Sequence, residues 1–258
     1  MSLLTGWLHA LPWVLVLALL VWALCTLRRN VGIVDIFWSL FVLVAALGFV
    51  RAAPEPTTRM LLVLLLVSIW AVRLAAYLAV RNQNAPEDHR YQAIRARNEP
   101  GFAWKSLYLV FGLQAVLAFI VSLPLYAAMT SSAPLALLDL AGAALVAAGV
   151  LVESIADAQL ADFRDDPANR GGVMDRGLWR YSRHPNYFGE FCVWWGFYLL
   201  ALAAGGWWAI ASPLLMSVLL MRVSGVTLLE KDITSRRPGY AGYVAQTNAF
   251  FPGPRRSA

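Results

Sequence analysis

Charged residues are scarce in this chain of 258 residues. They make up 14% of it, whereas charged residues form about a quarter of a typical soluble domain. Hydrophobic residues account for 60% of the sequence. This balance argues against a soluble domain and predicts a polytopic protein that resides in a lipid bilayer.

Residue types that commonly bind metals are also few. The chain has two cysteines, Cys25 and Cys192, and three histidines, His9, His89 and His184. Their spacing fits neither a metal site nor a disulfide framework, and the HExxH signature is missing. The basic residues follow the apolar runs, and the aromatic residues lie within those runs, which argues against a nucleic-acid partner. We therefore expect no metal and no nucleic acid.

The two common glycine-rich nucleotide motifs are missing as well. No GxGxxG follows a strand pattern, and GxxxxGK[ST] does not occur. A Rossmann domain and a P-loop are therefore excluded, and any nucleotide site must be built in another way.

Seven apolar runs are long enough to cross the roughly 30 Å hydrocarbon core of a bilayer. They cover residues 6–27, 33–50, 60–80, 106–129, 134–157, 187–204 and 206–229. A spanning segment must satisfy its own backbone hydrogen bonds, and the alternation of a barrel strand is absent from these runs. We predict an all-α, seven-helix membrane protein that forms a single domain.

The basic residues predict an orientation for this bundle. Of the 21 Lys and Arg residues, 17 follow the first, third, fifth or seventh run. The positive-inside rule then places the N-terminus outside the cell and the C-terminus in the cytosol.

Charged side chains interrupt the apolar runs at several positions, six of which point to a site. An ionised carboxylate near the middle of a bilayer costs at least about 2.5 to 3.5 kcal/mol, so such groups should face each other, a polar cavity or a ligand. Structural ion pairs, or an interfacial position for an arginine, would meet the same need. We favour a polar cavity open to the cytosolic side. The six residues are Asp35, Arg73, Glu153, Asp157, Glu190 and Arg222.

Two long polar segments are expected on the cytosolic side. Residues 81–105 contain a predicted amphipathic helix around Asp88–Arg97, and residues 158–186 are rich in Gly, Asp and Arg without periodicity. Arginine side chains suit phosphate groups, and the interleaved acids and amides suit ribose and adenine. The second segment therefore predicts a nucleotide site, with anionic lipid headgroups as the alternative ligand of its arginines.

A family resemblance is carried by two stretches, "GLWRYSRHPNYFGEFCVWWGF" at residues 177–197 and "RRPGYAGYVAQTNAFFPGP" at residues 236–254. They resemble bacterial membrane proteins related to steroid 5α-reductases, over about residues 150–253. The resemblance implies a seven-helix bundle of the bacterial inner membrane. It also implies that NADPH, bound in a cavity open to the cytosol, reduces an activated C=C bond of an apolar substrate such as a 3-oxo-Δ4 steroid. Residues 1–130 would then form the substrate side and residues 131–258 the NADPH-binding region.

The resemblance also implies site residues. Asp35 corresponds to a carboxylate that helps to polarise the substrate carbonyl, and Tyr77 or Tyr91 replaces its partner tyrosine. Asp35 would have to be protonated to donate a hydrogen bond, which burial favours; as an alternative, it pairs with Arg28 or Arg29. The predicted cofactor-binding residues are Glu153, Asp157, Arg164, Arg170, Arg176, Tyr181, Arg183, His184, Asn186, Glu190, Arg222, Arg237, Tyr240 and Tyr243.

Two other functions remain open. Isoprenylcysteine carboxyl methyltransferases, which bind S-adenosylmethionine, share the Arg-His-Pro-x-Tyr signature followed by Gly. S-adenosylmethionine has no phosphate, so the arginines between residues 164 and 183 favour NADPH. A lipid-binding scaffold without catalysis is the third hypothesis. In the tail, Arg236, Arg237, Tyr240 and Tyr243 are expected either to cover the nucleotide as a lid or to form an ordinary cytosolic tail.

Small residues predict where helices approach closely. The glycines expected to permit such contacts are Gly112, Gly142, Gly149, Gly189 and Gly196.

Overall fold

A computed structural model describes residues 3–53, 55–83, 85–223, 226, 230, 237 and 239–256. Every regular element within these residues is helical. Five helical segments are long and apolar enough to cross a membrane, namely Leu4–Arg28, Val31–Val50, Thr58–Asn82, Phe102–Met129 and Leu137–Asp165. The prediction of an all-α, multi-pass membrane protein is therefore confirmed.

The last two predicted runs form shorter helices. The run at 187–204 is helix α10 (Pro185–Ala203), and the run at 206–229 begins as the apolar helical segment Trp207–Val223. Residues 224, 225 and 227–229 of that run lie outside the described part of the chain. The count of seven spans and the orientation of the bundle stay predictions.

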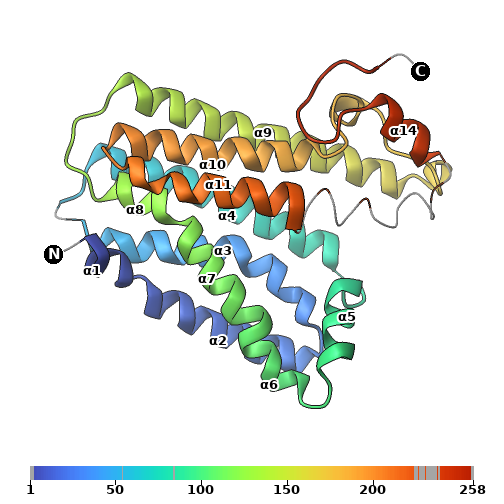
Figure 1. Ribbon diagram of the computed structural model, residues 1–258, viewed down its shortest axis with the longest axis horizontal. Coiled ribbons are helices and arrows are strands. Elements are labelled where there is room, and N and C mark those ends of the chain that lie inside the picture. Colours follow the sequence, from blue (N-terminus) through green and yellow to red (C-terminus); the bar gives the residue numbers. More distant parts are fainter. Residues whose placement is uncertain are drawn as a thin grey trace. The chain divides into compact units, whose positions relative to one another are not determined.

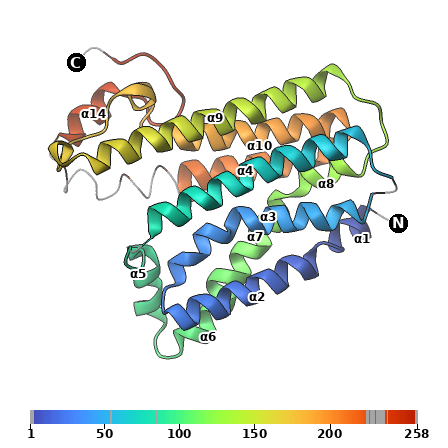
Figure 2. The same ribbon diagram turned by 180° about the vertical axis from the view of Figure 1, so that it is seen from behind.

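The first of two compact units comprises Met1–Ala136 and Leu200–Ala209. Within it, α3 lies between α2, α4 and α7, and all of them contact it (Figures 1 and 2). The elements of this unit are α1 (Leu3–Leu8), α2 (Leu11–Arg28), η1 (Val31–Ile33), α3 (Val34–Val50), α4 (Thr58–Asn82), α5 (His89–Asn98), α6 (Phe102–Ser106), η2 (Leu107–Gly112), α7 (Leu113–Val121) and α8 (Leu123–Met129).

Helix α5 confirms the amphipathic helix expected around Asp88–Arg97. Asp88 caps its N-terminus, where the side chain accepts a hydrogen bond from the Arg90 amide at 2.9 Å. The helix ends at Asn98, two residues before Pro100, which cannot continue a helical hydrogen-bond ladder. Asp88 and Pro100 thus account for the two ends of this helix.

The second unit comprises Leu137–Leu199 and Ile210–Ala258. Helix α9 runs beside α10, and α10 beside α11 (Figures 1 and 2). The Trp195 indole Nε1 on α10 donates to the Ser217 hydroxyl on α11 at 3.3 Å. The elements are α9 (Leu137–Asp165), η3 (Pro167–Asn169), η4 (Gly177–Arg180), α10, α11 (Ala211–Val218), η6 (Leu219–Val223) and α14 (Tyr240–Gln246). The sequence boundary between Ala209 and Ile210 falls within η5 (Trp207–Ile210). The division of the sequence at residues 130 and 131 stays a prediction.

Glycines bring α9 and α10 together along a common seam. A Cβ atom at Gly189 would lie 2.7 Å from the Gly149 carbonyl oxygen, and one at Gly196 would lie 2.8 Å from that of Gly142. Close helix approach is thus confirmed at these four glycines. The same prediction is wrong for Gly112, because a Cβ there would meet, among the described residues, only the Leu107 carbonyl of its own π-helical turn η2.

Candidate functional site

Asp35 lies in the first turn of α3, near the start of the run predicted at residues 33–50. The preceding chain forms the tight turn η1, in which the Asn30 side chain accepts a hydrogen bond from the Gly32 amide at 2.9 Å. This turn sets the start of α3 and places Asp35 at the end of the helix. Asp35 is partly exposed there, so its carboxylate does not lie deep within the apolar part of the span.

Two side chains of α5 engage the Asp35 carboxylate. The Tyr91 hydroxyl donates to Oδ1 at 2.5 Å, and the Arg90 guanidinium donates to Oδ2 at 2.9 Å. The ion pair therefore forms with Arg90, not with Arg28 or Arg29. Because both carboxylate oxygens accept hydrogen bonds, Asp35 is an acceptor in this structure. The role of Asp35 as a protonated donor stays a prediction.

Gln114 on α7 completes this group, which we call the Asp35 cluster: Asp35, Arg90, Tyr91 and Gln114. The Gln114 Nε2 donates to the Tyr91 hydroxyl oxygen at 2.9 Å. Its Oε1 is buried and has no hydrogen-bond partner among the described residues. A buried acceptor without a donor costs about 1 to 3 kcal/mol. Sequence reasoning missed both Arg90 and Gln114, although an amide inside the apolar run "FGLQAVLAFIV" was an available signal.

Electrostatics tie the members of the Asp35 cluster together. Burial raises the pKa of the Tyr91 phenol, and the charge of Asp35 and its hydrogen bond raise it further. Burial alone would lower the pKa of Arg90, but Asp88 and Asp35 outweigh it and raise that pKa. Tyr91 therefore keeps its proton, and Arg90 its charge, across the physiological range.

Glu87 fastens α5 to the start of α3. Its Oε1 accepts from the Val31 amide at 2.7 Å and from the Arg95 Nη2 at 2.7 Å, and its Oε2 accepts from the Arg95 Nε at 3.1 Å. The contact joins segments that are 56 residues apart in sequence. It holds Tyr91 at Asp35.

Tyr77, the other predicted catalytic tyrosine, lies on α4. The guanidinium groups of Arg73 and Arg81 lie 5.5 Å and 5.8 Å from its ring centroid. Arg73 and Arg81 each lie one helical turn from Tyr77, and both form cation–π contacts with its ring. Of the three predicted catalytic residues, Asp35 and Tyr91 are in contact with each other.

Four predicted cofactor residues form a second group, on facing sides of α9 and α10. We call this group the polar row: Glu153, Asp157, Asn186 and Glu190. Each helix contributes a pair four residues apart, which places both side chains of the pair on one face. The Asn186 Nδ2 donates to the Asp157 Oδ1 at 3.2 Å, and the Trp194 indole donates to the Glu190 Oε1 at 2.8 Å.

The polar row is buried beside the glycine seam. The exposed fractions of Glu153, Asp157 and Glu190 are 2%, 3% and 8%. A Cβ at Gly189 would lie 2.7 Å from the Glu153 Cγ, so the close helix approach depends on that glycine. Arg164 lies two turns beyond Asp157 on the same side of α9 and is exposed. The structure thus assembles the predicted inner residues of the site.

Arg183 and His184 contact a residue that the sequence analysis missed. The Arg183 guanidinium forms two hydrogen bonds with the Glu230 carboxylate, at 2.7 Å and 2.9 Å, and the His184 Nε2 lies 2.8 Å from Glu230 Oε1. Arg183 also donates to the Val244 and Thr247 carbonyl oxygens, at 3.2 Å and 2.6 Å. All three guanidinium nitrogens are thereby engaged, so Arg183 holds the tail in place.

Glu230 is ionised under physiological conditions in this setting. Burial would raise its pKa, but the hydrogen bonds from His184 and Arg183 and their charges lower the pKa to about 2. Glu230 follows the last apolar run, and nothing in its local sequence predicted that its partners would be Arg183 and His184, 47 and 46 residues away.

The predicted tail residues hydrogen-bond the polar loop that precedes α10. The Tyr243 hydroxyl donates to the Trp179 carbonyl at 2.5 Å, and Arg237 donates to the Gly172 carbonyl at 2.5 Å. The Tyr240 hydroxyl donates to Glu230 at 3.4 Å, and burial together with the Glu230 charge raises the pKa of Tyr240 to about 12. Arg236 lies outside the described residues.

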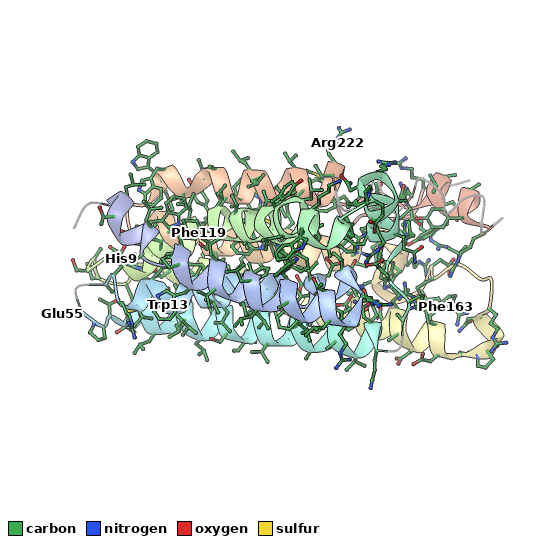
Figure 3. All side chains as sticks on the ribbon, turned by 90° about the horizontal axis from the view of Figure 1, so that it is seen from below. His9, Trp13, Glu55, Phe119, Phe163 and Arg222 are labelled. Atoms are coloured by element: carbon green, nitrogen blue, oxygen red, sulfur yellow. The ribbon has the colours of Figure 1, made fainter. Side chains whose placement is uncertain are left out.

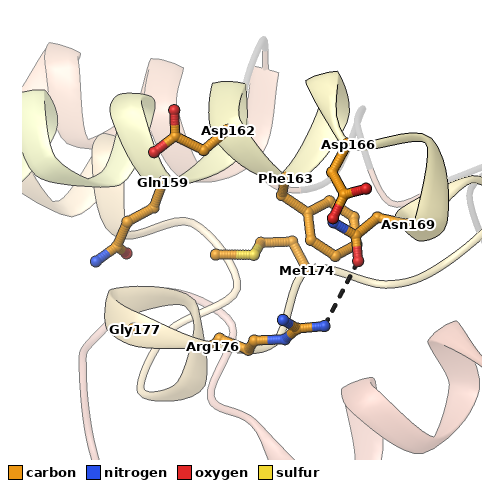
Figure 4. A pocket seen from close by; sticks show the side chains of 8 residues that line it. All are labelled: Gln159, Asp162, Phe163, Asp166, Asn169, Met174, Arg176 and Gly177. Carbon is orange, nitrogen blue, oxygen red and sulfur yellow. Dashed lines mark hydrogen bonds between the residues drawn. The ribbon is translucent and has the colours of Figure 1, made fainter.

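Arg176 contributes to an open pocket of about 390 Å³ (Figure 4). Its guanidinium donates to the Asn169 Oδ1 at 3.5 Å. Asp162 and Gln159, which also line the pocket, lie roughly half a turn around α9 from Asp157. This loop pocket is therefore on the opposite side of α9 from the polar row. Its lining residues are Gln159, Asp162, Phe163, Asp166, Asn169, Met174, Arg176 and Gly177.

The remaining predicted cofactor residues are exposed. Arg170 and Tyr181 lie on the surface of the polar loop, as does Arg180. Arg222, on η6, points away from its helix into the surroundings (Figure 3). Within the described residues, no three His, Cys, Asp or Glu side chains are grouped as metal ligands. The absence of a metal stays a prediction.

Comparison with known proteins places the chain in a family. The family model described as "Protein of unknown function (DUF1295)" matches residues 21–247. A curated protein of Schizosaccharomyces pombe, "Uncharacterized protein C594.04c", is 25% identical over 276 residues, which cover 92% of this chain and 77% of that protein. No solved structure matches the chain. Because the family model spans most of the sequence, the chain belongs to the DUF1295 family.

Proposed function

We propose that this chain is a multi-pass membrane reductase that uses NADPH to reduce an activated C=C bond in an apolar substrate. An enone such as a 3-oxo-Δ4 steroid is the proposed substrate class. The observation that carries the proposal is the polar row, in which three buried acidic residues and the half-buried Asn186 lie along two closely packed helices. Such burial is expensive in an apolar setting and is typical of a ligand site.

The family resemblance supports the same reading. Asn186 and Glu190 belong to the stretch 177–197 that resembles steroid 5α-reductases, and Asp157, which accepts a hydrogen bond from Asn186, corresponds by position to a cofactor-binding residue of that family. We further propose that the protein resides in the bacterial inner membrane, with its N-terminus outside and its C-terminus in the cytosol.

The donor set fits NADPH. The polar row offers carboxylates and an amide for hydroxyl and amide groups, and Arg164 lies at the open end of the same side of α9 for a phosphate. Arg170 and Arg180 add exposed guanidinium groups in the loop that follows. When bound, NADPH supplies the hydride for reduction of the double bond.

Other predicted cofactor residues have a supporting role in this proposal. Arg183, His184, Tyr240 and Tyr243 bind one another, Glu230 or main-chain carbonyls, so they shape the wall of the site. Arg176 belongs to the loop pocket on the opposite side of α9. Fewer residues are therefore proposed to contact NADPH directly than the sequence analysis predicted.

The Asp35 cluster is proposed to hold the oxygen-bearing end of the substrate. Tyr91 contacts Asp35, which lies near the start of the spanning segment Val31–Val50. An apolar molecule dissolved in the bilayer can present a polar end at such a position.

Ligand-induced stabilisation of the purified protein in detergent tests the proposal. We expect NADPH to raise the Tm, because a ligand at 100 times its Kd stabilises by about 2.7 kcal/mol. Asp157→Asn keeps the shape of the side chain and removes its charge, and should weaken NADPH binding about tenfold. Asp165→Asn, an exposed residue near the end of α9, is the matched control and should bind NADPH as the wild type does. A wild-type protein without any NADPH-dependent shift would refute the proposal.

The methyltransferase alternative is favoured by one observation. The loop pocket combines Asp162 and Asp166 with a single cation, Arg176, over the apolar side chains of Phe163 and Met174. The carboxylates can accept hydrogen bonds from the two ribose hydroxyls, and the apolar side chains can pack against adenine. Such a pocket suits a nucleoside ligand without phosphate, such as S-adenosylmethionine. A Tm increase with S-adenosylmethionine that Asp162→Asn abolishes would support this function. Stabilisation by neither ligand would favour the lipid-binding scaffold.

A further inference from the structure

Hydrogen bonds at the centre of the Asp35 cluster define which of its oxygen atoms are open. Tyr91 has one hydroxyl proton, and it points to Asp35 Oδ1 at 2.5 Å. Asp35 is held as an acceptor by Arg90 at 2.9 Å. The Gln114 Nε2 donates to the Tyr91 oxygen at 2.9 Å. What remains open is one lone pair on the Tyr91 oxygen and the buried Oε1 of Gln114.

The orientation of the Gln114 amide follows from the same network. If its oxygen and nitrogen were exchanged, Oε1 would face the Tyr91 oxygen, whose proton already lies towards Asp35. Two acceptors would then oppose each other, which is repulsive. The nitrogen therefore faces Tyr91, and Oε1 is the atom without a donor.

We infer that the Asp35 cluster binds a hydroxyl group of an apolar ligand, with Gln114 Oε1 as the acceptor of its proton. A ketone oxygen has no proton to donate and would leave the buried Gln114 Oε1 without a partner. A hydroxyl satisfies the buried Oε1, and an apolar remainder is required because Gln114 lies in the spanning segment Phe102–Met129. Gln114 is thus a specificity-determining residue.

This inference rests on the proposed function only in taking the ligand to be apolar, and it narrows the substrate class. The substrate would carry two oxygen functions, the carbonyl conjugated to the reducible bond and a separate hydroxyl. The cluster anchors the hydroxyl and does not polarise the carbonyl.

Equilibrium binding to the purified full chain in detergent micelles tests the inference without cofactor or turnover. The probes are cholestanol, cholestanone and cholestanyl methyl ether, which share one apolar skeleton and differ in the oxygen function. We expect cholestanol to bind about tenfold more tightly than either of the other two. Equal binding of the alcohol and the ketone would overturn the inference, as would the absence of saturable cholestanol binding.

Two variants assign the preference to Gln114. Gln114→Met keeps the length and the helix propensity of the side chain, suits an apolar span, and should reduce the alcohol preference to about one. Gln83→Met removes an exposed amide at the end of α4 and should leave the preference at its wild-type value. If Gln114→Met still bound cholestanol about tenfold more tightly than the ketone and the ether, the inference would also be overturned. Because the assay reads binding alone, loss of NADPH stabilisation would count against the reductase and leave this result standing.

Discussion

The guanidinium group of Arg183 shows how one side chain can organise a distant segment. It is 9% exposed and is shared between the Glu230 carboxylate and two main-chain carbonyls of the tail. Hydrogen bonds between charged, buried partners are strong because water does not compete for them. Removing Arg183 leaves the partly buried Glu230 with fewer partners to offset its desolvation, namely His184 and Tyr240.

Arg183→Ala should therefore lower the free energy of unfolding by about 3 to 5 kcal/mol. Thermal unfolding in detergent, followed by circular dichroism, measures the change. Arg180→Ala removes an exposed arginine three residues away and should change the stability by less than about 0.5 kcal/mol. Equal effects of the two variants would show that the Glu230 contacts contribute nothing specific.

Glu230 predicts how the stability depends on acid. Its pKa falls from 4.5 to about 2 in the folded chain, so the folded state favours the ionised form. This stabilisation is complete above pH 4.5 and is lost as the pH falls towards 2. The Tm of the wild type should decline over that window, and Glu230→Gln should lack this part of the decline. A Glu230→Gln profile parallel to that of the wild type would contradict the assignment.

Between helices, the contact of α9 with α10 depends on the absence of side chains. At Gly189 an added Cβ would lie 2.7 Å from the Gly149 carbonyl oxygen and 2.9 Å from the Glu153 backbone nitrogen. Both neighbours are backbone atoms that cannot rotate away. The two helices must separate, and the polar row must separate with them.

Gly189→Ala should therefore destabilise the protein by about 1 to 3 kcal/mol and weaken NADPH binding. Gly242→Ala is a suitable control, because Gly242 lies in α14 and an added Cβ meets nothing within 4 Å among the described residues. Alanine there should leave stability unchanged or raise it by up to about 1 kcal/mol, since it favours the helix. Thermal unfolding and NADPH titration of both variants provide the measurement.

Over the full chain, the unequal distribution of basic residues is the basis of the proposed topology. Two helices lie outside the five candidate spans, α10 and Trp207–Val223. The bundle has seven spans if both of them cross the membrane and five if neither does. With seven spans, the connection near residue 204 lies outside the cell. With five, it lies on the same side as the C-terminus.

Cysteine labelling in intact bacterial cells distinguishes these arrangements. In a background in which Cys25 and Cys192 are replaced by alanine, Ala204→Cys should react with a membrane-impermeant maleimide. Ser131→Cys should react as well, because it lies in a predicted outer loop, whereas Arg256→Cys should react only after lysis. Protection of Ala204→Cys in intact cells would refute the seven-span arrangement.

The helices themselves could be predicted because their causes are local. An apolar run long enough to cross the bilayer must form a helix to satisfy its backbone, wherever the rest of the chain lies. Helix α5 was predicted around Asp88–Arg97 from its local sequence, and the glycines of α9 and α10 indicated a close contact. Asn186 and Glu190 were found through a short motif in which they lie one helical turn apart, and Asp157 was found through the family resemblance of the preceding helix.

Only the tertiary structure decided which groups are partners across long separations. Asp35 with Arg90 and Tyr91, Glu230 with Arg183 and His184, and the buried Oε1 of Gln114 all depend on segments brought together from distant parts of the chain. Composition and spacing carry no information about such encounters, because packing sets which charged groups meet after the helices have formed. The amino-acid sequence therefore determined a helical membrane protein with candidate polar residues, and the packing of its helices decided which of them meet and which atoms remain open to a ligand.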